Sequence, residues 1–111
     1  MKKQRESLRE SELKDIFKLY KVTAKSIEGK GATAFIPDIL CWDEEGNTFF
    51  IELKDGSTFS VGQLYLLKRL KNTYGCEYID GNYCFYDFKG IEPVEITIKK
   101  ILEGVKDGRE I

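Results

Sequence analysis

Hydrophobic positions recur every three or four residues in three parts of the chain, the spacing that predicts amphipathic helices. The first helix is expected over residues 7–20. The second opens at Ser60, follows an apolar stripe of leucines, and closes with Gly75 in the C′ position that favours glycine. The third helix contains the apolar residues of the last segment, namely Ile98, Ile101, Leu102 and Val105.

Alternating and β-branched segments between these helices predict strands. We expect strands over residues 21–27, 35–42, 48–54, 77–79 and 83–88, with a glycine-bearing loop over 28–33. The order is αβββαβ followed by further β and α elements, which is a mixed α/β fold. We expect residues 1–111 to be one domain, with a basic tail at 1–6, a core at 7–88 and a C-terminal extension at 89–111.

The hairpin between the second and third strands sets the register of two carboxylates. Glu44-Glu45-Gly46 fits a three-residue loop whose last residue is a left-handed glycine, so Asp43 pairs with Asn47. This register carries Asp38 directly opposite Glu52, with Cβ atoms roughly 4.5–5.5 Å apart. Two carboxylates so close repel unless a cation lies between them, and a divalent ion with oxygen ligands is the natural occupant. A slip of one residue would turn Asp38 away.

Composition narrows the chemistry available to such a site. The 111 residues include no histidine, which excludes histidine-based acid–base catalysis and ordinary histidine-ligated zinc. The 3 cysteines lack CxxC spacing and are expected to be reduced. Lys54 follows Glu52 by two residues and shares its face of the strand, where it can orient a water or stabilise charge on a phosphate. Carboxylates, a lysine and a metal ion are a suitable set for phosphodiester hydrolysis.

The charge is segregated along the chain although the net charge is only −1. Residues 1–30 carry +4, residues 31–59 carry −5, residues 60–75 carry +3 and residues 76–111 carry −3. The positive segments flank the acidic one, so DNA binding should be weak without metal and sensitive to salt. The candidate phosphate contacts in these segments are Lys21, Lys25, Lys30, Lys68, Arg69 and Lys71.

We expect no signal peptide, and no apolar run approaches the roughly 20 residues that a membrane span needs. We therefore expect a cytoplasmic protein without membrane partners, and we expect no nucleotide cofactor.

A sequence motif connects the same residues. Pro37-Asp38 is separated by 13 residues from Glu52-Leu53-Lys54, and Ser60-x-x-Gln63 follows at the start of a leucine-rich helix. This pattern resembles the viral replication–repair (VRR) nuclease branch of the PD-(D/E)xK superfamily over roughly residues 7–88. The sequence departs from that pattern at Phe35, where the family tends to have glycine. The resemblance implies a restriction-endonuclease-like core, a mixed central sheet flanked by helices.

The resemblance also implies roles for individual residues. Asp38, Glu52 and the carbonyl of Leu53 would hold Mg²⁺ or Mn²⁺, and Lys54 would be the catalytic lysine. Gln63 would line the site, although Ser60-x-x-Gln63 is equally a capping box. The family adds a glutamate from the first helix, for which Glu12 is our choice and Glu10 the alternative.

Small stand-alone members of this family suggest a homodimeric DNA endonuclease acting on branched DNA such as a four-way junction, with a phage or prophage origin. The competing hypothesis is a catalytically silent domain of the same fold that binds nucleic acid or a partner protein. The complete set of Asp38, Glu52 and Lys54 favours the enzyme.

Overall fold

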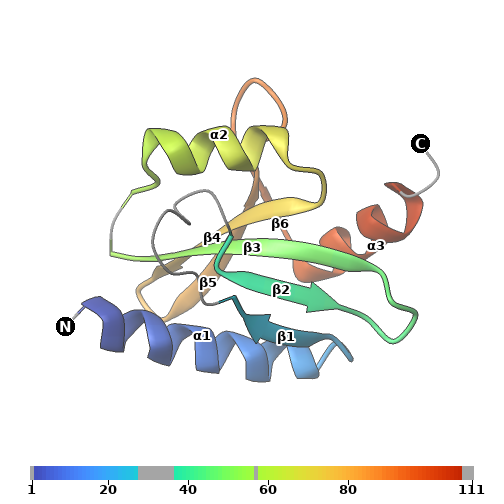
Figure 1. Cartoon of the computed structure of the whole chain (residues 1–111), viewed down its shortest axis with the longest axis horizontal. Helices are drawn as coiled ribbons and strands as arrows, with labels where there is room; N and C mark the ends of the chain where they lie inside the picture. The colour runs from blue at the N-terminus through green and yellow to red at the C-terminus, as the bar shows by residue number, and fades with distance from the viewer. Residues whose placement is uncertain (1, 28–36, 57, 109–111) are drawn as a thin grey trace.

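The computed structural model describes residues 2–27, 37–56 and 58–108 of the chain. Figure 1 shows the elements, which follow the predicted order. They are α1 (Lys2–Lys18), β1 (Thr23–Ser26), β2 (Ile39–Trp42), β3 (Thr48–Asp55), α2 (Val61–Arg69), β4 (Thr73–Ile79), β5 (Asn82–Asp87), β6 (Val94–Ile96) and α3 (Ile98–Gly108). The mixed α/β prediction is therefore confirmed.

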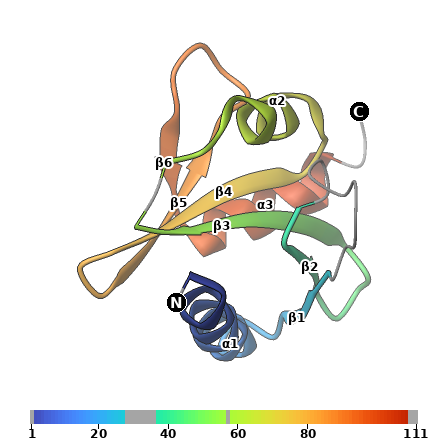
Figure 2. The same ribbon diagram turned by 60° about the vertical axis from the view of Figure 1, so that its left-hand side comes forward.

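The strands form one six-stranded sheet in chain order, β1-β2-β3-β4-β5-β6. Only β3 and β4 pair in parallel, because α2 carries the chain back between them; the other neighbours are antiparallel. Figure 2 shows α1 and α2 on opposite sides of the sheet. The site described below lies on the α2 side.

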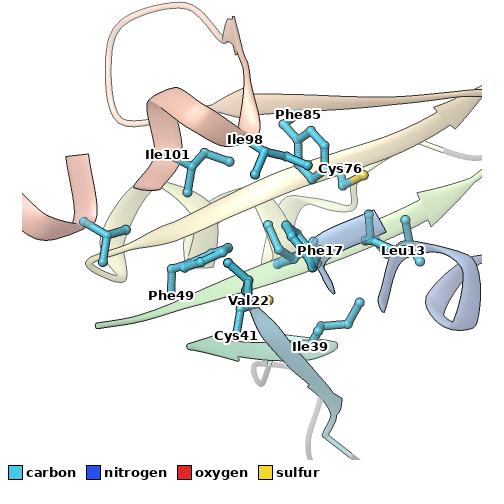
Figure 3. Close-up of a cluster of buried hydrophobic side chains, with 13 residues drawn as sticks. Leu13, Phe17, Val22, Ile39, Cys41, Phe49, Cys76, Phe85, Ile98 and Ile101 are labelled. Carbon is cyan, nitrogen blue, oxygen red and sulfur yellow. The ribbon is translucent and has the colours of Figure 1, made fainter. Parts of the chain in front are cut away.

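The hydrophobic core fills the space between the sheet and the two helices α1 and α3. Phe17 of α1 packs against Phe49 of β3 and Phe85 of β5, with ring centroids 5.8 and 5.9 Å apart. Ile101 of α3 is fully buried in the same cluster, which Figure 3 shows. Because side chains alternate along a strand, this packing commits Phe49, Ile51 and Leu53 to the core and turns Phe50, Glu52 and Lys54 toward α2.

The predicted hairpin register is confirmed. Ile39 pairs with Ile51 and Trp42 with Thr48. The Asp43 amide donates to the Asn47 carbonyl at 3.0 Å, and Gly46 has the left-handed φ of 87° that the loop requires. The ladder of β2 begins at Ile39, so Asp38 lies one residue before its first pair.

Two predicted boundaries are wrong. Gly75 lies within β4 rather than after a helix, because α2 ends at Arg69, Leu70 becomes extended and Asn72 turns the chain with a φ of 54°. Residues 2–6, expected as a basic tail, are the first turns of α1, since lysine, arginine, glutamine and glutamate all favour a helix. Lys30, Phe35 and the whole of the predicted 28–33 loop lie outside the described residues.

Candidate active site

Asp38 and Glu52 meet where β2 begins beside β3. The Leu53 amide donates to Asp38 Oδ2 at 2.8 Å, and the Ile27 amide donates to the Asp38 carbonyl oxygen at 2.8 Å. Asp38 is therefore held between β1 and β3 by main-chain contacts on both sides. Glu52 is only 5% exposed, which is unusual for a carboxylate.

The environment of Glu52 disfavours a negative charge. Burial, and next the neighbouring Asp38 carboxylate, raise its pKa from 4.5 to about 8, although Lys54 and the Gln63 amide act in the opposite direction. Its Oε2 accepts from Gln63 Nε2 at 2.7 Å. Its Oε1 is buried and has no hydrogen-bond partner among the described residues. Such an oxygen is costly unless a proton or a cation satisfies it.

Gln63 takes part in the capping box of α2 and also contacts Glu52. Its main-chain N–H donates to Ser60 Oγ at 3.2 Å, and its side-chain Oε1 accepts from the Ser60 amide at 2.8 Å, which completes the capping box. The amide nitrogen of the same side chain reaches Glu52. The cap of α2 therefore fixes the orientation of Glu52.

Lys54 lies on the same face of β3 as Glu52, two residues further along the strand. It is half-buried and lines an open cavity of about 580 Å³ at the carboxyl ends of the parallel strands β3 and β4. Arg9, Thr58, Glu77 and Asp80 line this cavity too.

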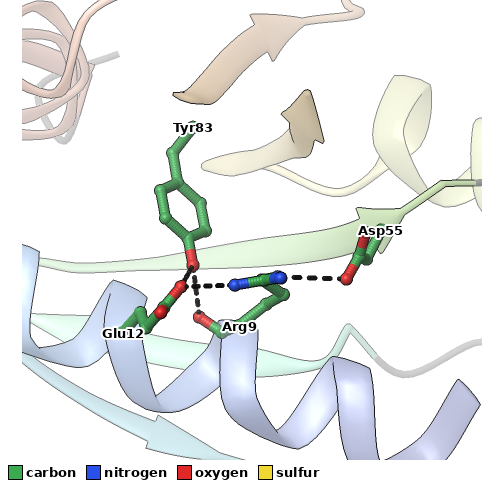
Figure 4. A network of polar contacts seen from close by, with 4 residues as sticks. All are labelled: Arg9, Glu12, Asp55 and Tyr83. Atoms are coloured by element: carbon green, nitrogen blue, oxygen red, sulfur yellow. Dashed lines mark hydrogen bonds and ion pairs between the residues drawn. The ribbon is translucent and has the colours of Figure 1, made fainter. Parts of the chain in front are cut away.

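A polar network fastens α1 to the end of β3, as Figure 4 shows. Arg9 Nε donates to Asp55 Oδ2 at 3.1 Å, and Arg9 Nη1 donates to Glu12 Oε1 at 2.8 Å. The Tyr83 hydroxyl also donates to Glu12, and the Arg9 guanidinium lies 3.8 Å from the centroid of the Tyr78 ring. The Tyr83 and Arg9 hydrogen bonds lower the pKa of Glu12. Sequence analysis missed Arg9 and Tyr83, because contacts across 46 and 71 residues leave no local pattern.

The two helix glutamates have different neighbours. Glu12 is engaged by Arg9 and Tyr83, whereas Glu10 Oε1 accepts from the Ser26 hydroxyl at 2.6 Å. Ser26 is the cross-strand partner of Ile39, the residue after Asp38. Of the two helix glutamates, Glu10 is therefore the one whose hydrogen-bond partner, Ser26, lies across the sheet from the residue next to Asp38.

The candidate phosphate contacts divide into two groups. Lys25 pairs across β1 and β2 with Leu40, which pairs with Phe50, so Lys25 lies on the Glu52 face of the sheet. Lys68, Arg69 and Lys71 are exposed at the end of α2 and just after it, on that same side. Lys21 lies beside the Asp43–Asn47 hairpin, at the end of β3 away from Lys54.

Groups of three or more metal-binding side chains are absent from the described ranges, so an ion here would have two carboxylates and main-chain or solvent oxygens as ligands. Of the helices that the structure describes, none combines the length and hydropathy that crossing a bilayer demands.

No protein-family model and no curated protein matches this sequence. Among solved structures, the chain is similar to Hjc, a Holliday junction resolvase from the archaeal hyperthermophile Archaeoglobus fulgidus. The two share 16% sequence identity with a TM-score of 0.60, over 85% of this chain and 89% of that one. At this identity the similarity concerns the fold. The chain has the restriction-endonuclease-like fold, a mixed sheet flanked by helices.

Proposed function

We propose that this protein is a divalent-metal-dependent endonuclease that hydrolyses phosphodiester bonds in DNA, with branched DNA as its substrate. The observation that carries the proposal is the buried Oε1 of Glu52, which lacks a hydrogen-bond partner among the described residues and lies beside Asp38 and Lys54. The fold shared with a Holliday junction resolvase supports the choice of a branched substrate.

The residues present fit a divalent ion. Glu52 Oε1 is buried without a hydrogen-bond partner among the described residues, and repulsion from the adjacent Asp38 carboxylate helps to raise the pKa of Glu52. A bound cation would pair with Oε1 and would also offset this repulsion. Asp38, Glu52 and the Leu53 carbonyl would hold it, with Mg²⁺ or Mn²⁺ preferred for all-oxygen ligands. When bound, the ion would neutralise phosphate charge and lower the pKa of an attacking water.

The remaining residues have separate tasks. Lys54 contributes a positive charge to the phosphate as negative charge builds on its oxygens. Gln63 holds Glu52 Oε2, which leaves Oε1 directed at the ligand. Lys25 and Lys68 guide the flanking backbone, as phosphate contacts position DNA without reading its sequence. Glu10 or Glu12 adds a further acidic group from α1.

The finer features of the proposal follow from the sequence motif. The Pro37-Asp38, Glu52-Leu53-Lys54 and Ser60…Gln63 pattern resembles the viral replication–repair nuclease branch, which supports membership of that branch and a phage or prophage origin. A homodimer with two sites related by a two-fold axis would suit paired cuts in a symmetric junction.

A cleavage assay tests the proposal. We expect Mg²⁺- or Mn²⁺-dependent cutting of a labelled four-way junction by the wild type, and a loss of at least about 100-fold in Glu52→Gln and in Lys54→Ala. Glu45→Gln, which alters an exposed hairpin glutamate, is the matched control and should cut normally. Unchanged cutting by both site variants would contradict the proposal. If branched and linear DNA are both left intact, the catalytically silent domain is the better description.

A further inference from the structure

A second hollow lies next to the Lys54 cavity on the same face of the sheet. It has a volume of about 330 Å³, and three aromatic residues dominate its lining, namely Phe59, Tyr86 and Phe88. We call it the aromatic pocket. Thr58 and Glu77 line both this pocket and the Lys54 cavity, so the two are adjoining parts of one surface.

Gly75 of β4 allows these rings to come together. A Cβ at this position would lie 2.7 Å from Phe88 Cε2 and 3.0 Å from Phe59 Cζ. The Phe59 and Phe88 rings meet edge to face with centroids 5.4 Å apart, and the Tyr86 and Phe88 centroids are 6.2 Å apart. Tyr86 is the cross-strand partner of Gly75. Phe59 and Tyr86 are only half-buried, so parts of both rings remain accessible from the pocket.

The size and lining of the pocket favour a small, flat, aromatic ligand. Its volume is at the lower end of the range for ligand pockets, which suits one planar ring system better than a folded segment of another protein. The Glu77 carboxylate at its boundary can accept a hydrogen bond from an exocyclic amino group of adenine or cytosine. Lys68 Nζ lies 3.4 Å from the Phe88 carbonyl oxygen, which places a cation beside the pocket.

We propose that the aromatic pocket takes one unpaired nucleobase of the strand whose phosphate lies at Lys54. This inference rests on the proposed nuclease function and deepens it, because it requires a substrate with an unstacked base next to the cut. Stacking on aromatic side chains tolerates every base, since each has a π-face. The substrate class is therefore DNA with unpaired nucleotides at a branch point, where extruding a base costs least.

A binding experiment without metal tests this inference separately from catalysis. Fluorescence anisotropy in EDTA would compare a labelled oligo(dA) 12-mer with an abasic 12-mer of the same backbone charge. We expect the full-length wild type to bind the base-containing strand at least about fivefold more tightly. Tyr86→Leu and Phe59→Leu should each abolish most of this preference, while Tyr86→Phe retains it. Tyr20→Leu removes an aromatic ring that is 45% exposed and lines other hollows, and should keep the preference.

The other outcomes are equally distinct. Equal affinity of the wild type for both strands, or a preference that survives in both leucine variants, would overturn the inference. If those variants keep the preference but shift the sedimentation coefficient from dimer to monomer, the pocket is a contact between copies of the chain. A wild type that cleaves DNA with metal but binds both strands equally would refute only this inference. A wild type that prefers the base-containing strand but does not cleave would refute only the nuclease proposal.

Discussion

Glu52 faces two opposing requirements at the scale of a single residue. Burial favours the neutral carboxyl, and Asp38 repels the anionic form, whereas a divalent ion needs that anion as its ligand. In the metal-free protein, the raised pKa means that the folded state holds a proton over a pH range in which the unfolded chain releases it. A cation at this site would replace the proton.

This conflict predicts a pH-dependent effect of Glu52→Gln on stability. The folded pKa of about 8 lies above the ordinary 4.5, so the wild type loses stability as pH rises from about 5 to 8, and the loss levels off above that range. In EDTA, the free energy of unfolding of Glu52→Gln should rise relative to that of the wild type over this interval, by about 1–3 kcal/mol. Urea denaturation at several pH values measures it. If the difference in unfolding free energy between Glu52→Gln and the wild type stays constant with pH, the pKa of Glu52 is not raised in the folded protein. Glu45→Gln, at an exposed glutamate, is the control.

The carboxylate pair could be predicted from sequence because hairpin geometry propagates along a ladder. One left-handed glycine, Gly46, fixes the pairing of Asp43 with Asn47, and every later pair follows. The orphaned Glu52 oxygen could not be predicted, since it depends on α2 packing over β3. Arg9 and Ser26 were missed for the same reason: their partners Asp55 and Glu10 are close only in three dimensions.

At the scale of elements, α2 links its own cap to the site. Ser60 and Gln63 exchange hydrogen bonds at the first turn, and Gln63 extends the arrangement to Glu52. A capping box is visible in sequence, but its second contact is not. The end of α2 was misjudged because the leucine pattern continues past Arg69, whereas Asn72 adopts a left-handed conformation and starts β4.

Two variants separate the two tasks of this cap. Ser60→Ala should lower the free energy of unfolding by about 1 kcal/mol and leave cleavage intact, because Gln63 can still reach Glu52. Gln63→Ala should cost about as much stability and also reduce cleavage or metal affinity about 10- to 100-fold. Thermal unfolding and initial cleavage rates would measure both. Equal losses of activity in the two variants would show that the cap acts through stability alone.

The packing between β4 and the aromatic rings gives another test at this scale. Gly75→Ala should lower the free energy of unfolding by about 1–3 kcal/mol, because its new methyl group would press on the Phe59 and Phe88 rings. Gly104→Ala in α3 is the matched control. The nearest atom to its Cβ would be the Tyr74 hydroxyl oxygen at 3.9 Å, so helix propensity should raise stability by about 0.5–1 kcal/mol. Similar effects at both positions would contradict this packing.

At the scale of the whole molecule, the structure shows which positive residues lie on the Glu52 side of the sheet. Lys25 and the α2 cations share the Glu52 side of the sheet, whereas Lys21 lies at the far hairpin. Sequence alone could identify positive segments but could not separate Lys21 from Lys25, since that distinction depends on how β1 enters the sheet.

Salt dependence should distinguish these two lysines. In EDTA, Lys25→Gln should reduce the slope of log binding constant against log salt by about one, as expected for one lost phosphate contact. Lys21→Gln should leave the slope unchanged, although both lysines are exposed. Anisotropy titrations with a four-way junction over a salt series would measure it. A reduced slope in Lys21→Gln would place the DNA at the Asp43–Asn47 hairpin as well.

A crystal structure of the protein soaked in Mn²⁺ would show whether Asp38 and Glu52 share a divalent ion. We predict an anomalous difference peak bounded by Asp38, Glu52 Oε1 and the Leu53 carbonyl oxygen, and no such peak in Glu52→Gln crystals soaked identically. An Mn²⁺-soaked wild-type crystal without density at that position, or with its only bound ion elsewhere, would show that the two carboxylates do not share an ion.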